Sequence, residues 1–198
     1  ARLQTVINEA CEGLEGVSAN EIYESTLKNL YPGVKRSNVR ESLVMTARTM
    51  VEKDPNYSFV TARLLMDTLR AEALSFLGIT NAATQSEMHY RYGTALKCYI
   101  EKGVELELLS PHLLEFDLTV LGEALQADRD MQFTYLGLQT LYDRYFIHRN
   151  DVRFELPQGF YMRVAMGLAS NEENNEERAI EFYNLISSFD YMVSTPQL

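Results

Sequence analysis

Apolar side chains recur at intervals of three and four residues along nearly the whole chain, and this spacing is typical of amphipathic helices. In the first part of the chain the pattern predicts helices over about residues 3–14, 19–30, 38–51 and 58–77. Ser18 and Glu21 have the spacing of a capping box, in which each side chain satisfies a backbone amide at the helix start. Ser37 can cap the third helix. A small and polar stretch, residues 78–86, then indicates a boundary, so a first helical unit is expected over residues 1–77.

A second unit is expected over residues 86–198. It should contain helices over about residues 86–100, 110–126, 131–143, 157–169 and 176–192. Pro111 and Pro157 fit the first helical position, where a missing amide hydrogen costs no intrahelical bond. Between Tyr145 and Glu155 the period changes to two, which predicts one short β-hairpin. The expected fold is therefore all-α, mainly helical, with two packed helical units and one hairpin near residues 145–155.

Both ends of the chain suggest that it is a piece of a longer protein. It opens on Ala1 without an initiator methionine, and its first apolar stripe has no N-cap before it. At the other end a helix runs into Ser194, Thr195 and Pro196, and the sequence stops at Leu198. We therefore expect much of the function to depend on the remainder of the parent protein.

Composition narrows the classes of function. With 198 residues and 46% hydrophobic side chains, the chain can bury a substantial core. Its 18 basic and 28 acidic side chains give a net charge of −10, which disfavours nucleic acid as a partner because phosphate binding needs a basic face. No apolar run approaches the roughly 20 residues that span a bilayer, so no membrane partner is expected. A cytoplasmic protein is the resulting expectation.

Residues with reactive side chains do not form a catalytic set. Cys11 and Cys98 stand alone and are expected to be reduced core residues. His89, His112 and His148 lack metal-ligand spacing. Glycine-rich phosphate-binding motifs are also absent from the sequence. The residues alone therefore predict no catalytic residue, no metal and no cofactor held by this chain.

Two segments could bind an anion. Lys35, Arg36 and Arg40 lie at the start of a predicted helix, where free amides and the helix dipole favour a phosphate group. The alternative is a solvated basic loop. The second segment is Ser194-Thr195, whose hydroxyl groups follow a predicted helix.

Several motifs in the second half of the chain occur in an order that resembles a known family. They are Arg129–Gly137 (RDMQFTYLG), Leu141–Tyr145 (LYDRY), Glu155–Ala169 (ELPQGFYMRVAMGLA), Phe182–Asn184 (FYN) and Ser194–Pro196 (STP). This run resembles the N-terminal helical region of the large subunit of class I ribonucleotide reductase, most strongly over residues 85–198. Residues 2–77 resemble the helical part of the ATP-cone, the regulatory module of that subunit.

The cone-like segment departs from the family pattern in three ways. The β-rich opening of a cone is missing. Arg36 stands where the family has a threonine that contacts nucleotide, and Ala71 stands where it has a lysine. The resemblance therefore implies a degenerate ATP-cone, in which Lys35, Arg36 and Arg40 are the candidate nucleotide-binding residues and ATP or dATP binds weakly or not at all.

The family implies a reaction that this chain alone cannot perform. Its enzymes reduce ribonucleoside diphosphates to deoxyribonucleoside diphosphates for DNA synthesis, on an α/β barrel expected after residue 198. A small subunit supplies the radical, reducing thiols supply the electrons, and ATP and dATP act as allosteric effectors. The family threonine that contacts the substrate phosphate corresponds to Thr195. The isolated chain is expected to be regulatory or structural and inactive.

Two other classes of function remain open from the sequence. A stand-alone helical protein-interaction module would explain the acidic, helical character, but not the ordered motifs. A small nucleotide-sensing regulator would use Lys35, Arg36 and Arg40, and nucleotide binding by the isolated chain would favour it.

Overall fold

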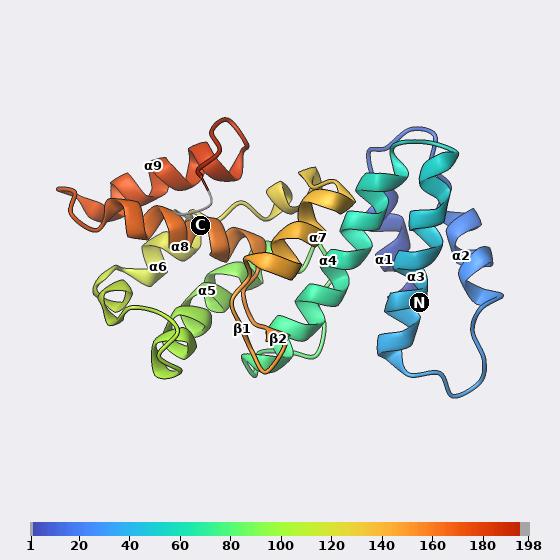
Figure 1. Ribbon diagram of the computed structural model, residues 1–198, viewed down its shortest axis with the longest axis horizontal. Coiled ribbons are helices and arrows are strands. Elements are labelled where there is room, and N and C mark those ends of the chain that lie inside the picture. Colours follow the sequence, from blue (N-terminus) through green and yellow to red (C-terminus); the bar gives the residue numbers. More distant parts are fainter. Residues whose placement is uncertain (1, 195–198) are drawn as a thin grey trace.

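The computed structural model describes residues 2–194. Its first part contains helices that pack at one end of an elongated molecule (Figure 1). These elements are α1 (Arg2–Cys11), α2 (Ala19–Leu27), α3 (Arg36–Thr49), the 3-10 helix η1 (Met50–Glu52) and the long helix α4 (Tyr57–Phe76). Their three- to four-residue apolar spacing places one face of each helix in the core, as with Val6, Ile7 and Ala10 of α1.

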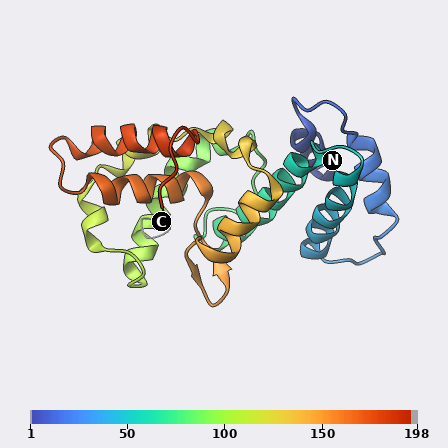
Figure 2. The same cartoon turned by 45° about the horizontal axis from the view of Figure 1, so that its top comes forward.

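The second part is also helical and carries one hairpin. It contains α5 (Met88–Glu105), η2 (Pro111–Glu115), α6 (Leu118–Glu123), η3 (Ala127–Gln132), α7 (Tyr135–Arg144), β1 (His148–Arg149), β2 (Val152–Arg153), α8 (Pro157–Ala169) and α9 (Asn175–Ser187). Helices α8 and α9 lie side by side in both views (Figures 1 and 2). The mainly all-α fold expected from the sequence is confirmed.

The hairpin lies within the segment where the sequence period changes. Strands β1 and β2 are antiparallel, with His148 opposite Arg153 and Arg149 opposite Val152. Asn150 and Asp151 connect them with φ angles of 51° and 63°. Two-residue hairpin turns with both central residues at positive φ match the twist of the strands, and Asn and Asp tolerate this conformation.

Two of the predicted helices are interrupted. The segment 110–126 breaks at Phe116 and Asp117, because the Asp117 carboxylate accepts hydrogen bonds from the amides of Thr119 and Val120 and starts a new helix. The segment 131–143 begins instead as part of η3, and α7 starts only after Thr134, whose hydroxyl accepts from the Gly137 amide. The last helix ends at Ser187 rather than near residue 192, since Phe189 has a left-handed φ of 65°.

Two predicted helix caps also differ from the structure. Ser37 does not cap α3, which starts at Arg36 without a side-chain cap; its hydroxyl bonds Asn38 instead. The capping box of α2 is half formed, because Ser18 accepts from the Glu21 amide while its own amide donates to the hydroxyl of Tyr57. The Glu21 carboxylate pairs with Lys53.

Helix α4 packs against α1 and α3 on one side and against α7, β2 and η3 on the other (Figure 1). Polar side chains strengthen both contacts. The guanidinium of Arg63 donates to carbonyl oxygens of α1 and its following turn, at Ala10 and Glu12, and to the Met131 carbonyl of η3. The Glu72 carboxylate accepts from the Tyr142 hydroxyl and the Arg153 amide. The division into units 1–77 and 86–198 stays a prediction, and α4 is the helix that joins the two parts.

Candidate functional site

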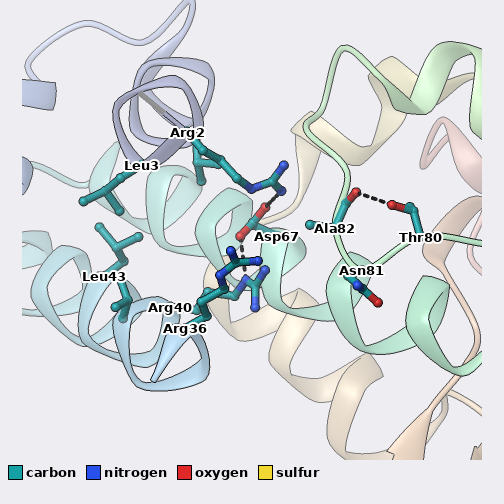
Figure 3. Close-up of a pocket in the computed structure, with 11 residues that line it drawn as sticks. Arg2, Leu3, Arg36, Arg40, Leu43, Asp67, Thr80, Asn81 and Ala82 are labelled. Atoms are coloured by element: carbon teal, nitrogen blue, oxygen red, sulfur yellow. Dashed lines mark hydrogen bonds and ion pairs between the residues drawn. The ribbon is translucent and has the colours of Figure 1, made fainter. Parts of the chain in front are cut away.

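A pocket of about 420 Å³ opens between α1, α3, α4 and the segment 80–82 (Figure 3). Its lining combines arginine side chains, one carboxylate and apolar side chains. The lining residues are Arg2, Leu3, Val6, Arg36, Val39, Arg40, Leu43, Asp67, Thr80, Asn81 and Ala82. Because α1, α3 and α4 are held by their apolar faces, the arginines are brought together from distant parts of the sequence.

Asp67 is the central charge of this pocket. The residue is only 4% exposed and lies on the buried side of α4. Its Oδ1 atom is 3.2 Å from Nη2 of Arg2, and its Oδ2 atom is 3.0 Å from Nε of Arg40. Figure 3 shows the two guanidinium groups approaching this carboxylate from α1 and α3. A buried carboxylate needs such partners, since an uncompensated charge in the interior is strongly destabilising.

The structure brings together part of the predicted anion site. Arg36 and Arg40 both line the pocket, whereas Lys35 is exposed just before α3 and is not among the lining residues. Within residues 2–194, no ion pair or hydrogen bond engages the side chain of Arg36, which is exposed. Ala71 lies one helical turn after Asp67 on α4 and is buried.

Sequence reasoning missed Arg2 and Asp67 as site residues. Asp67 did carry a signal, because it interrupts an apolar stretch of α4 between Met66 and Leu69. A carboxylate on a buried helix face requires a cationic partner, so it could have been noticed. Nothing in the sequence indicates that Arg2, 65 positions away, is that partner.

A second set of polar contacts starts one turn beyond Asp67. Arg70 is 3% exposed, and its guanidinium donates to the Ala83 carbonyl and to Oε1 of Gln85, at 3.0 and 2.9 Å. The Gln85 amide nitrogen in turn donates to the Ala127 carbonyl at 2.8 Å. Residues 80–82, which line the pocket, thus lie beside a buried chain of hydrogen bonds that reaches η3.

The chemistry available in this pocket is electrostatic. It presents the guanidinium groups of Arg2, Arg36 and Arg40 against the single carboxylate of Asp67, so its net charge favours an anion. Guanidinium groups bind phosphate and carboxylate through paired hydrogen bonds. Two of the three cations already bind Asp67, so an incoming anion has to compete with that carboxylate.

Two buried carboxylates hold the second part of the chain together. Asp130 is 1% exposed and accepts hydrogen bonds from the Tyr92 hydroxyl and the Gln158 amide nitrogen. Burial raises the pKa of Asp130 to about 6. Glu155 is fully buried and accepts from the Tyr99 hydroxyl, the Ile147 amide and Nε of Arg163. Both networks pack inside the helical core and are structural.

The other residues singled out in the sequence are the Ser194-Thr195 segment and the two cysteines. Thr195 lies outside the described residues, and Ser194 before it is exposed. Cys11 and Cys98 are free and half-buried. Burial raises the pKa of the Cys11 thiol to about 11, which keeps it protonated near neutral pH.

Residues 2–194 contain no candidate metal site and no candidate membrane span. No group of three or more His, Cys, Asp or Glu side chains in this range could hold a metal ion. None of the helices in the same range is both long and apolar enough to cross a membrane.

Comparison with known proteins identifies the class of this helical region. Residues 131–198 match the family model for the all-alpha domain of ribonucleotide reductase. These residues include α7, the hairpin, α8 and α9, and they contain most of the ordered motifs found in the sequence.

Relatives with longer matches identify the subunit. The chain is 43% identical to the ribonucleoside-diphosphate reductase subunit alpha of Chlamydia trachomatis over 184 residues, which are 93% of this chain and 17% of that protein. It is 34% identical to the alpha subunit of Helicobacter pylori over 199 residues, 100% of this chain and 24% of that protein. It is 27% identical to the alpha subunit of ribonucleoside-diphosphate reductase 1 of Escherichia coli over 208 residues, which are 98% of this chain and 25% of that protein.

The chain therefore belongs to the family of ribonucleoside-diphosphate reductase alpha subunits, and it spans a quarter or less of the length of these relatives. The resemblance seen in the ordered motifs is confirmed. The family model begins at residue 131, so the degenerate ATP-cone over residues 2–77 stays a prediction.

Proposed function

We propose that this chain is a non-catalytic, regulatory and structural part of a ribonucleoside-diphosphate reductase large subunit. The observation that carries the proposal is the 43% identity to an alpha subunit over 93% of the chain. The complete protein would reduce ribonucleoside diphosphates to deoxyribonucleoside diphosphates, with a radical from a small subunit and electrons from reducing thiols. Its location would be cytoplasmic.

This proposal is tested with the complete large subunit and the isolated chain side by side. Each is mixed with the small subunit, a dithiol reductant and a ribonucleoside diphosphate, and deoxyribonucleotide formation is measured. Turnover is expected only with the complete subunit. The proposal fails if the complete subunit is inactive under conditions where a reference reductase turns over, or if residues 1–198 alone reduce the substrate.

For the arginine-lined pocket, we propose a degenerate effector site that binds ATP and dATP weakly. Arg36 and Arg40 line this pocket, which supports anion binding, and the pairing of Arg2 and Arg40 with Asp67 supports a low affinity. Ala71 offers no cation on the same stretch of α4. One missing charge-assisted hydrogen bond lowers phosphate affinity by about ten- to a hundred-fold, since it is worth about 1.5–3 kcal/mol. Calorimetry that gives micromolar ATP affinity for the isolated chain would contradict this.

In the complete subunit, Thr195 would donate a hydrogen bond to the phosphate of the substrate. The proposal is supported by the Ser-Thr-Pro motif, in which Pro196 fixes the backbone after the donor. The partners of this chain would be the remainder of the large subunit, the small radical-generating subunit, the ribonucleoside diphosphate and the nucleotide effectors.

A further inference from the structure

The short 3-10 helix η3 lies between the helical core of the second part and the last turn of α9. Side chains three positions apart lie on the same line of a 3-10 helix, because each turn has three residues. One line is buried and consists of Ala127, Asp130 and the following Phe133. Arg129 and Gln132 form the neighbouring line, which faces α9. The two lines therefore contact different parts of the fold.

The buried line fixes η3 to the core. The Asp130 carboxylate accepts hydrogen bonds from the Tyr92 hydroxyl of α5 and the Gln158 amide nitrogen of α8. In addition, the Met131 carbonyl accepts two hydrogen bonds from the Arg63 guanidinium of α4, at 3.0 and 3.2 Å. Because three helices hold it, η3 is a firm support for the segment that its other line binds.

That other line binds the end of α9. Nη1 of Arg129 donates to Oδ1 of Asn184 at 2.9 Å and to Oγ of Ser187 at 2.7 Å. The same guanidinium lies 5.4 Å from the centroid of the Tyr183 ring. The Gln132 amide nitrogen donates to the carbonyl of Ser187, and the last carbonyls of a helix have no partner within it. A cation at this end also compensates the negative end of the helix dipole.

The chain turns sharply where it leaves α9. Phe189 has a left-handed backbone with φ 65°, which is unfavourable for a residue with a side chain. Its ring meets that of Phe133 edge-on, with 5.3 Å between centroids, and its amide donates to the Ile186 carbonyl at 3.3 Å. The Tyr191 amide donates to the Leu185 carbonyl at 3.1 Å. Contacts with η3 and its C-cap therefore hold both the last turn of α9 and the turn that follows it.

The substrate-contact candidate Thr195 follows Ser187 by only eight positions. A segment this short carries a change in the direction of the helix end into the position of the residues that follow. A displacement of about 1 Å in a substrate site can cost about 100-fold in rate, even when the altered residue is remote from the chemistry. The anchoring of α9 on η3 therefore has a consequence for substrate binding.

We propose that Arg129 and Gln132 are positioning residues for the substrate contact of Thr195. They act through the end of α9, whose direction they set, and not by contact with the substrate. Both belong to the motif Arg129–Gly137, to which the proposed function gives no role. The proposal rests on the proposed function, because it requires that Thr195 bind the substrate phosphate.

The test is steady-state kinetics of variants of the complete large subunit with its small subunit. Arg129→Ala removes both side-chain hydrogen bonds to α9, so we expect KM for the ribonucleoside diphosphate to rise roughly ten-fold with kcat nearly unchanged. Gln132→Leu removes the donor to Ser187 and should raise KM as well. Arg129→Lys keeps the cation and a donor, so it should restore part of the affinity. Wild-type KM in both Arg129→Ala and Gln132→Leu would overturn the proposal.

Arg153→Ala is the matched control for a general loss of stability. The Arg153 guanidinium also donates two hydrogen bonds, to the Tyr142 and Asp151 carbonyls, and lies 4.4 Å from the centroid of the Tyr142 ring. It belongs to the hairpin, away from α9 (Figures 1 and 2). Arg153→Ala and Arg129→Ala should lower the melting temperature by similar amounts, and only Arg129→Ala should raise KM. Equal increases in KM would overturn the proposal.

A double variant distinguishes positioning from an independent effect. If Arg129 acts through Thr195, Arg129→Ala combined with Thr195→Val should have the KM of Thr195→Val alone, because a misplaced hydroxyl and a missing one lose the same contact. A KM in which the two single effects multiply would show that Arg129 acts independently of Thr195, and the proposal would be wrong.

Failure of the proposed function gives different results. If Thr195→Val leaves KM unchanged, the phosphate contact and the positioning role are both wrong. If Thr195→Val raises KM while Arg129→Ala and Gln132→Leu do not, only the positioning role is wrong. Calorimetric binding of the ribonucleoside diphosphate provides the same comparison without turnover. A complete subunit that shows the expected order of affinities but performs no reduction retains the positioning role and loses only the assigned reaction.

Discussion

The carboxylate of Asp67 and the guanidinium of Arg40 lie 3.0 Å apart, between Oδ2 and Nε, and join α4 to α3 across 27 positions of sequence. Arg2 binds the other carboxylate oxygen from α1. One buried acid thus holds three helices together and also occupies two of the three cations that line the pocket.

Replacing this acid should change anion affinity and stability in opposite directions. Asp67→Asn removes the charge that competes for Arg2 and Arg40, so we expect tighter binding of ATP or pyrophosphate, by about ten-fold for each 1.4 kcal/mol of competition removed. The same variant should lose about 1–3 kcal/mol of folding free energy, because the amide has one acceptor oxygen where the carboxylate has two, so one of the two guanidinium groups loses its hydrogen bond and both lose the ion pair. Calorimetry and urea unfolding measure the two effects.

Asp128→Asn is the control for this experiment. Asp128 pairs with His89 on an exposed surface, where its side chain is 81% exposed, and it does not line the arginine pocket. It should leave both anion affinity and stability close to wild type. Unchanged affinity in Asp67→Asn would show that Asp67 does not compete with the anion.

Glu155 should be the most costly carboxylate to neutralise. It is fully buried and joins Tyr99 of α5, the Ile147 amide before the hairpin and Arg163 of α8. Glu155→Gln leaves the largely buried charge of Arg163 without its carboxylate, so we expect a loss of about 3–5 kcal/mol in denaturant unfolding. Glu105→Gln, which affects an exposed pair with Lys102, should cost less than about 1 kcal/mol. Similar losses in both variants would refute the role of Glu155.

Asp130 should make stability fall as pH rises. Burial raises its pKa from 3.8 to about 6 in the folded chain, so between these values the folded state binds more protons than the unfolded state. By linkage, its contribution is most favourable below pH 4 and is lost as pH rises to 6. The change in the free energy of unfolding amounts to about 3 kcal/mol, because a tenfold difference in proton affinity between the two states corresponds to about 1.4 kcal/mol.

The measurement compares wild type with Asp130→Asn in urea between pH 4 and 7. Subtracting the free energy of unfolding of the variant from that of wild type at each pH removes the contribution of the other carboxylates, which titrate in both proteins. Wild type should lose stability relative to the variant over this range. A difference that stays constant with pH would show that Asp130 keeps an ordinary pKa.

Helix periodicity was sufficient to predict most of the elements, because burial of one helix face repeats every three to four residues. The periodicity did not predict the breaks at Phe116 and Phe133, because the apolar spacing continues across them. At these points Asp117 and Thr134 cap the starts of new helices. The capping box failed for a tertiary reason. The Ser18 amide donates to Tyr57, 39 positions away, which a local motif cannot indicate.

The same limit applies to the arginine pocket. Arg36 and Arg40 are predictable as anion ligands because they are neighbours at a helix start. The pocket also depends on Arg2 and Asp67, which meet only after α1, α3 and α4 have packed. Lys35 shares the local signal, but lies outside the lining.

Removing the hydroxyl of Thr195 should weaken substrate binding in the complete subunit. Thr195→Val keeps the shape of the side chain and removes the hydroxyl that we propose to bind the substrate phosphate. Loss of one hydrogen bond to a charged group costs about 1.5–3 kcal/mol, and it should raise KM if ground state and transition state both use the bond. Thr140→Val, the same change on α7, where the hydroxyl donates to the Leu136 carbonyl, serves as the control and should leave KM unchanged. Unchanged kinetics for Thr195→Val together with a lower melting temperature would instead assign the hydroxyl to the folding of this segment, because a structural hydrogen bond affects stability and leaves substrate binding unaltered.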